Sequence, residues 1–263
     1  MDVKAKYIRL LGCAAAIGLL CLLLGATSLS VKAKRAEKVC TGLDVVFADS
    51  LKFITSDDIK GFLDRQYGNY VGQKLDSVGL ARIEHLLEAK SAVMESEAWT
   101  TDDGTLHVSI TQRAPAIRFQ KGMMGFYADD TGFIFPTHKT FTAPVPCIKG
   151  DIPVTITPGF KGELESAKEK QWVLDVLALT RYMSKSKTLE GKISEMSVNS
   201  EGDIVMTPAT GGEIIIFGSP TDAGAKFERL EKYYSHILPA KGEGYYKIVN
   251  VKYNGQIICR KDI

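Results

Sequence analysis

The side chains that could carry out chemistry are few in this sequence and lie far apart. Four histidines occur in 263 residues, each in a different predicted element, and no H-E-x-x-H motif or His–carboxylate pair with the spacing of metal ligands is present. These histidines are His85, His107, His138 and His236. We therefore expect surface or packing roles for them and predict that the chain binds no metal.

Two pairs of adjacent carboxylates are the other candidates for catalysis. Asp102-Asp103 and Asp129-Asp130 each stand shortly before a glycine. Aspartate is favoured in such turns because its side chain accepts hydrogen bonds from the nearby backbone. We therefore interpret both pairs as turns and not as a general acid and base.

The cysteines and glycines of the sequence do not form a recognisable catalytic, metal-binding or nucleotide-binding motif. Of five cysteines, Cys13 and Cys21 fall in an apolar segment, and Cys40, Cys147 and Cys259 stand singly without C-x-x-C spacing. Whether Cys147 and Cys259 bond to each other stays open. No G-x-S-x-G, P-loop or G-x-G-x-x-G motif occurs. The sequence predicts a protein that is not an enzyme and uses no cofactor and no small-molecule substrate; a hydrolase whose site assembles from distant residues is an alternative.

Charge is distributed unevenly along the chain. Six of the 33 basic residues but only one of the 31 acidic residues lie in the first 35 positions, so the rest of the chain is mildly acidic. A body without a basic stripe cannot release many phosphate counterions. We therefore expect no nucleic-acid partner.

The apolar segment at residues 10–31 contains no charged residue and is bracketed by Arg9 and Lys32. About 20 helical residues cross a bilayer core, so this segment is long enough to span a membrane. A cleaved signal peptide is the alternative, but the run exceeds the usual signal length and a basic cluster follows it. The sequence predicts a transmembrane helix here. The count of basic residues on either side leaves the orientation open.

The first part of the body predicts a β-α-α-β-β unit. A Val- and Phe-rich strand near residue 45 precedes a helix that begins at Ser56 and closes at Gly68. A second helix carries an apolar stripe from Leu80 to Leu87. Two extended runs then flank Asp103-Gly104, which is a strong hairpin signal. Pro115 marks the break to the next domain.

The rest of the body predicts a mixed sheet with two helices. A helix is expected over 162–183, a buried central strand over 213–218, and a second helix after Asp222 that Pro239 stops. Asn254-Gly255 near the end predicts a hairpin or tightly bent strand at a sheet edge. The fold class is therefore α+β: an N-terminal transmembrane helix, a β-α-α-β-β domain, and a mixed β-sheet domain with two packed helices.

Three short patterns in this body resemble the FtsQ/DivIB family of bacterial cell-division proteins. ITQRAPAIRF resembles the family's exit from its POTRA domain, YADDTGFIFP resembles its D-x-x-G-x-x-F segment, and VNVKYNGQIICR resembles its closing strand. The order of the elements also matches, so the resemblance covers nearly the whole chain. Gln112 departs from the family, where an acidic residue is usual at this point.

The resemblance implies a division of the chain into five parts. These are a cytoplasmic tail (1–9), a transmembrane helix (10–31), a linker (32–41), a POTRA-like domain (42–115) and an FtsQ-type β domain (116–263). It also implies a single-pass protein of the cytoplasmic (inner) membrane, with its N-terminus in the cytoplasm and its body in the periplasm.

The resemblance further implies a divisome scaffold that supports septum formation. Its partners would be FtsB-like and FtsL-like proteins, and other divisome proteins through the POTRA-like domain. In the family, a segment of the FtsB-like partner adds as a strand beside the last strands. The implied partner-binding residues are Tyr253, Asn254, Gly255, Gln256, Ile257 and Ile258.

Two alternatives to this interpretation remain open. The six residues could form an ordinary C-terminal hairpin whose apolar members only fill the core. The whole protein could instead be a POTRA-type chaperone or transport component, which binds extended polypeptides by the same edge pairing.

Overall fold

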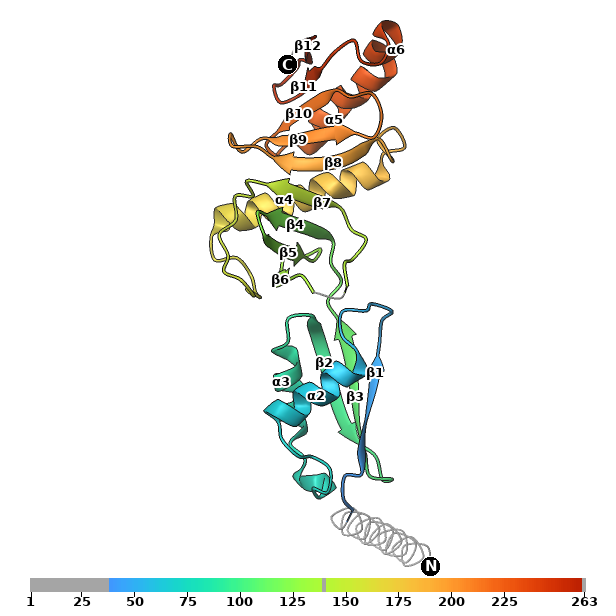
Figure 1. The fold of residues 1–263 in the computed structure, drawn as a ribbon, viewed down its shortest axis with the longest axis vertical. Coiled ribbons are helices and arrows are strands. Elements are labelled where there is room, and N and C mark those ends of the chain that lie inside the picture. The colour runs from blue at the N-terminus through green and yellow to red at the C-terminus, as the bar shows by residue number, and fades with distance from the viewer. Residues whose placement is uncertain (1–37, 139–140, 262–263) are drawn as a thin grey trace, which may run out of the picture. The chain divides into compact units, whose positions relative to one another are not determined.

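A computed structural model describes residues 38–138 and 141–261 (Figure 1). The described chain divides into two compact units. The first comprises Ile54–Gln112 and the described residues before Leu51, and the second comprises Leu51–Phe53 and the described residues from Arg113 onward.

The first unit packs two helices on a three-stranded sheet. The sheet order is β1-β3-β2, in which β1 runs parallel and β2 antiparallel to β3. The elements are β1 (Gly42–Phe47), α2 (Ser56–Gln66), a 3₁₀ turn (Leu75–Ser77), α3 (Leu80–Glu88), β2 (Val93–Thr100) and β3 (Thr105–Gln112). This is the β-α-α-β-β order that the sequence predicts.

Helix α2 shows how local sequence sets an element's start. The Oγ1 atom of Thr55 accepts from the Asp58 backbone N–H at 3.2 Å, and the Asp58 carboxylate accepts from the Thr55 N–H at 3.0 Å. This reciprocal cap satisfies two backbone donors that the first helical turn leaves free. The cap is therefore Thr55, one residue before the predicted start. Ile59 and Leu63 then face the core, fully buried.

The second unit is built on a nine-stranded mixed sheet in the order β12-β11-β10-β9-β8-β7-β4-β5-β6. Three neighbouring pairs are parallel, namely β4–β7, β7–β8 and β10–β11. The strands are β4 (Ile117–Lys121), β5 (Met124–Ala128), β6 (Ile134–Pro136), β7 (Cys147–Gly150), β8 (Ile193–Val198), β9 (Ile204–Pro208), β10 (Ile214–Gly218), β11 (Ile248–Asn250) and β12 (Ile258–Arg260).

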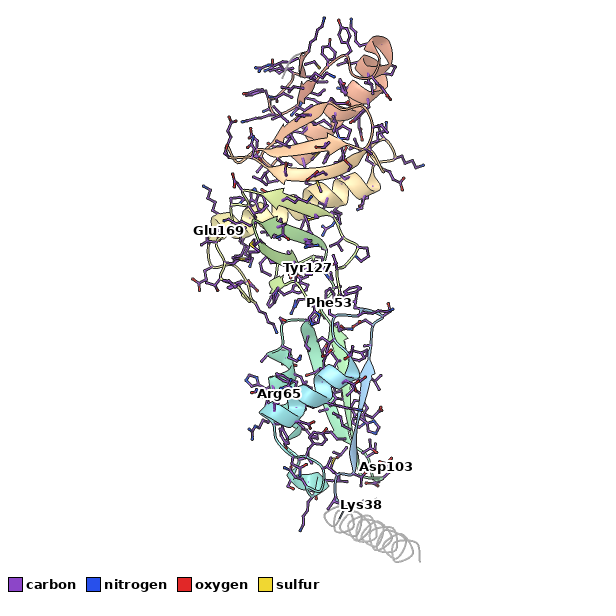
Figure 2. All side chains as sticks on the ribbon, viewed as in Figure 1. Lys38, Phe53, Arg65, Asp103, Tyr127 and Glu169 are labelled. Atoms are coloured by element: carbon purple, nitrogen blue, oxygen red, sulfur yellow. The ribbon has the colours of Figure 1, made fainter. Side chains whose placement is uncertain are left out.

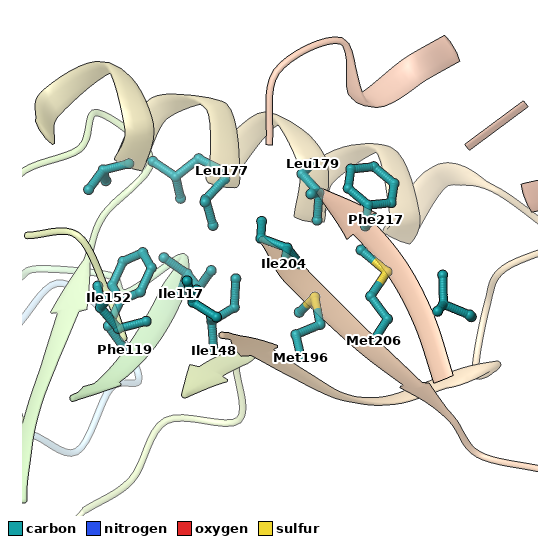
Figure 3. Close-up of a cluster of buried hydrophobic side chains, with 14 of the residues drawn as sticks. Ile117, Phe119, Ile148, Ile152, Leu177, Leu179, Met196, Ile204, Met206 and Phe217 are labelled. Carbon is teal, nitrogen blue, oxygen red and sulfur yellow. The ribbon is translucent and has the colours of Figure 1, made fainter. Parts of the chain in front are cut away.

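Two helices cover one face of this sheet and form the core with it. These are α4 (Ala167–Lys185) and α5 (Ala223–Lys232). Figure 3 shows Leu177 and Leu179 of α4 above Ile204 of β9, with Phe217 of β10 beside Leu179. Alternate residues of each strand face these helices, as the two-residue period of a strand requires. The fold class is thus α+β, with a large sheet after the POTRA-like unit.

Two predicted helix boundaries are wrong. Helix α4 begins at Ala167 and not at residue 162, because Ser166 caps it by accepting from the Glu169 N–H at 3.4 Å. Pro239 does not stop the last helix. A π-helical turn (Tyr233–Ile237) follows α5 and leads directly into α6 (Leu238–Lys241), so the helical run passes through Pro239 and ends at Lys241.

Two of the segments that resemble the family are joined by an ion pair inside the second unit. The Arg113 guanidinium donates to Asp129 Oδ2 at 2.5 Å and lies 3.8 Å from the centroid of the Phe133 ring. The other oxygen of Asp129 accepts from Thr131 and from the Phe133 N–H. The predicted Asp129-to-Gly132 turn between β5 and β6 is therefore present and is held from Arg113.

The predicted tail, transmembrane helix at 10–31 and most of the linker lie outside the described residues. Within 38–138 and 141–261, no helix has both the length and the apolar character needed to cross a membrane.

Candidate functional site

The six predicted partner-binding residues lie in and after the connection between β11 and β12. The two strands pair antiparallel, with Val249 opposite Cys259, so the predicted C-terminal hairpin is present. Gly255 takes a φ of 73°, which favours glycine at the turn. Only Ile258 of the six belongs to a strand.

The turn divides the six residues into three groups. Tyr253, Gln256 and Ile258 line one surface hollow of about 360 Å³, together with residues of β10, β11 and β12. Ile257 turns the other way and packs against the hydrophobic core, while Asn254 and Gly255 are exposed at the turn's tip. The structure therefore brings three of the predicted residues together and gives Ile257 a core role.

Strand β12 forms one edge of the nine-stranded sheet, as the sequence predicts. Among the described residues, β11 is its only strand partner. The Arg260 carbonyl accepts from the Lys247 N–H at 2.8 Å on the β11 side. Because successive residues of a strand direct their backbone groups to opposite sides, the Cys259 N–H and C=O point toward the outer edge.

The opposite edge of the sheet, at β6, is closed. Ile134 exchanges two backbone hydrogen bonds with Gly162, at 2.9 and 3.0 Å. Pro136, at the end of β6, has no N–H to offer. A further strand therefore finds donors and acceptors at β12 that β6 lacks.

The chain that leads from β11 into the turn is held by three contacts. Arg229 of α5 donates twice to the Val251 carbonyl, at 3.1 and 2.9 Å. Asn250 Oδ1 accepts from the Lys252 N–H at 2.9 Å. Lys252 donates to Asp203 at 2.6 Å, and this hydrogen bond raises the pKa of Lys252. The turn is thus preorganised by Arg229 and Asp203, which lie 22 and 49 positions before their partners in the sequence.

The first unit contains a hydrogen-bonded set that sequence spacing did not indicate. His107 Nδ1 lies 3.1 Å from Asp44 Oδ2, and His107 Nε2 lies 3.1 Å from Thr101 Oγ1. This order of hydroxyl, imidazole and carboxylate resembles a nucleophile with its base and orienting acid.

The hydrogen bonds of Thr101 argue against nucleophilic activation. Its hydroxyl donates to Asp103 Oδ1 at 2.5 Å, so its proton is not directed at the imidazole. This bond, with those from Thr105, lowers the pKa of the Asp103 carboxyl to about 2. Asp103 lies in the turn before β3 (Figure 2), where the sequence placed it. We interpret the set as a surface network.

Metal ligands and disulfides are also absent from the part of the chain that the structure describes. No group of three or more His, Cys, Asp or Glu side chains there could hold a metal ion. Cys147 and Cys259 are both free thiols, and four strands separate β7 from β12 in the sheet. Burial raises the pKa of the Cys259 thiol.

A β-α-α-β-β unit followed by a helix-covered mixed sheet is the order of elements that the resemblance to cell-division proteins implies. The family model described as FtsQ/DivIB, C-terminal related, matches residues 114–260, and the POTRA-like domain model matches residues 38–111. No curated protein matches the chain. The chain belongs to the FtsQ/DivIB family, whose members act in cell division through protein–protein interactions in the divisome.

Proposed function

We propose that the chain is a membrane-anchored divisome scaffold that binds FtsB-like and FtsL-like proteins and supports septum formation. The binding mode is β-strand addition at β12, outside the cytoplasmic membrane. The chain itself carries out no catalytic step. Other divisome proteins bind through the POTRA-like domain, at residues 42–115.

The single observation that carries the proposal is the difference between the two edges of the large sheet. Strand β6 is closed by its hydrogen bonds to Gly162, whereas β12 has no described neighbour on its outer side. A free edge is an aggregation liability that proteins usually block. A partner strand at β12 would pair the outer N–H and C=O groups that the described residues leave free.

The hollow beside β12 supplies specificity in this proposal. A strand added at the edge directs every second side chain to the same face as Ile258 and Arg260. Tyr253, 47% exposed, stands beside that face. A partner strand with an apolar side chain at such a position would cover the hollow and bury the Tyr253 ring.

The anchor and the location are part of the proposal. Residues 10–31 span the cytoplasmic membrane once, residues 1–9 remain in the cytoplasm, and residues 32–41 link the span to the body. The body, including the β domain at 116–263, lies in the periplasm. The apolar run at 10–31 and the basic residues that follow it support an uncleaved span, and the orientation rests on the resemblance to the family.

A pull-down from membranes tests the function directly. The intact chain is compared with a Tyr253→Lys, Ile258→Lys double variant, which places two charges in the hollow and spares the core residue Ile257. Met123→Lys is the matched control, because Met123 is fully exposed at the turn between β4 and β5 of the same unit. Circular dichroism verifies that each variant folds.

We expect the intact chain and the Met123→Lys control to recover an FtsB/FtsL-type pair. The double variant should recover at least about tenfold less, since truncating or charging the centre of an interface commonly costs this much. Equal recovery by all three chains would refute binding at β12. Recovery of no such pair by the intact chain would refute the scaffold function.

A further inference from the structure

Glu213 is a buried carboxylate without a partner. It is 1% exposed, and neither of its carboxylate oxygens has a hydrogen-bond partner among the residues that the structure describes. It precedes β10 by one residue and shares the core-facing side with Ile215 and Phe217. An unpaired buried carboxylate is costly, so such a group calls for a cation or a donor.

The surroundings of Glu213 are aromatic. The π-helical turn places Tyr233 and Tyr234 in the core, with their ring centroids 5.4 Å apart. The Tyr234 hydroxyl is also buried without a described partner. Burial, followed by the charge of Glu213, raises the pKa of Tyr233 to about 12 and raises the pKa of Tyr234 as well. A π-helical turn within a helix is itself frequent at functional sites.

The rim of this cluster already holds one cation. Lys192 Nζ lies 4.7 Å from the centroid of the Tyr234 ring, and Lys192 is exposed. The face of a tyrosine ring attracts cations, and a carboxylate beside it strengthens the attraction. Carboxylate, ring faces and a free hydroxyl together are the set of groups that recognises a basic side chain.

A two-glycine turn lies against the Glu213 carboxylate. Its Oε2 lies so close to Gly211 that a Cβ built there would stand 2.3 Å from it. Gly211 and Gly212 are both exposed and take φ angles of 106° and 89°. The backbone of a residue without a side chain therefore lies against the carboxylate on this side, and this is the side from which a partner's side chain would enter.

We propose that Glu213, Tyr233 and Tyr234 form a receptor for one arginine side chain of a protein partner. A guanidinium is favoured over an ammonium because it is weakly hydrated, stacks on aromatic rings and donates in parallel to a carboxylate. The site lies on the helix-covered face of the sheet, opposite the hollow beside β12. It therefore goes beyond the proposed strand addition and does not depend on it.

The test uses the full chain and Nα-acetyl-argininamide as the probe, with binding followed by calorimetry. Nα-acetyl-citrullinamide, a neutral molecule of the same shape, is the control ligand. Glu213→Gln removes the charge while keeping the shape, and Glu243→Gln is the matched control because Glu243 is exposed in the same unit. A ligand of this size supports a Kd of about 1 mM.

We expect saturable binding of the arginine probe to the parent and to Glu243→Gln, at least tenfold weaker binding to Glu213→Gln, and none of the citrulline probe. Equal binding to the parent and Glu213→Gln, or none to the parent, overturns the proposal.

Lys192→Gln gives a second, independent test of whether the site is filled from within the chain. Each single variant changes the free energy of unfolding relative to the parent. We expect the change in the double variant to equal the sum of the changes caused by Lys192→Gln and by Glu213→Gln. Strong coupling between the two would mean that Lys192 occupies the site, which also overturns the proposal.

Discussion

Gln112 shows how local contacts can favour one side chain over a closely similar one. Its side-chain amide donates to Asp49 Oδ1 at 2.9 Å, its backbone N–H donates to Asp49 Oδ2 at 2.6 Å, and its Oε1 accepts from the Ile54 N–H at 3.0 Å. The side chain is 2% exposed. An acidic residue here would face the Asp49 carboxylate, so the amide suits this chain better.

Gln112→Glu should therefore destabilise the first unit. The change replaces a donor by a buried carboxylate beside the partly buried carboxylate of Asp49, which should cost at least about 2 kcal/mol of unfolding free energy at neutral pH. Urea unfolding of the full chain measures this. Adding Asp49→Asn to the variant should restore most of the loss, because one donor returns. A Gln112→Glu chain as stable as the parent would contradict the role given to this contact.

Asp129 makes the second unit sensitive to acid. Burial opposes its charge, but the hydrogen bonds from Thr131, Arg113 and Phe133 outweigh burial, and the pKa of Asp129 is lowered. A lowered folded-state pKa contributes stability above the unfolded pKa of about 4, and this stability is lost as the pH falls through the folded value. The stability that Asp129 contributes should thus begin to decline below about pH 4, and the ion pair with Arg113 should break only as the pH falls through the lowered folded-state pKa.

Asp129→Asn should remove this dependence. Breaking a buried ion pair costs about 3–5 kcal/mol, so the variant should be less stable than the parent at pH 7 and the difference should shrink below pH 4. Urea unfolding at several pH values measures both effects. A difference that stays constant from pH 7 to pH 3 would mean that Asp129 does not carry the acid sensitivity.

Sequence could predict some of these residues and not others. The turn at Asp129 follows from its aspartates and Gly132, which are neighbours in the chain. The contacts of Arg113 with Asp129, Arg229 with Val251 and His107 with Asp44 join residues 16, 22 and 63 positions apart. Such pairs come together only when the chain folds, so no local sequence pattern predicts them.

At the scale of elements, periodicity and turn residues predicted most strands and helices, but not every boundary. The predicted start of α4 was early because apolar periodicity does not distinguish a cap from the helix that it caps. The predicted stop at Pro239 failed because a π-helical turn leads the helical run through the proline to Lys241. These two helix boundaries therefore depend on backbone hydrogen bonds that apolar periodicity does not predict.

Gly150, at the end of β7, tests how closely two strands pack. A Cβ there would stand 2.3 Å from the Val198 carbonyl oxygen of β8, and the φ of Gly150 is 98°. Gly150→Ala should cost at least about 3 kcal/mol, since it adds a collision to backbone strain. Gly191→Ala, with a φ of 68° and no atom within 4 Å, is the matched control.

The control should cost about 1–2 kcal/mol, which is the strain alone. Thermal or urea unfolding of both variants gives the comparison. Equal losses would show that β7 and β8 can separate to admit a methyl group.

For the molecule as a whole, the order of the strands in the large sheet could not be predicted from the sequence. Parallel pairs such as β4–β7 and β10–β11 join segments separated by helices or long loops, and their order decides which strands become edges. The sequence predicted an edge near Asn254, and the topology places β12 there. The hydrogen bonds that close β6 at Gly162 could be identified only from the structure.

The most direct measurement of strand addition is amide hydrogen exchange in the chain alone and with a purified FtsB/FtsL-type pair. We expect the Cys259 amide, whose N–H faces the outer edge, to exchange at least about tenfold more slowly in the complex, while amides of β6 are unchanged. Binding that leaves the Cys259 amide unprotected, or that protects β6 instead, would contradict strand addition at β12.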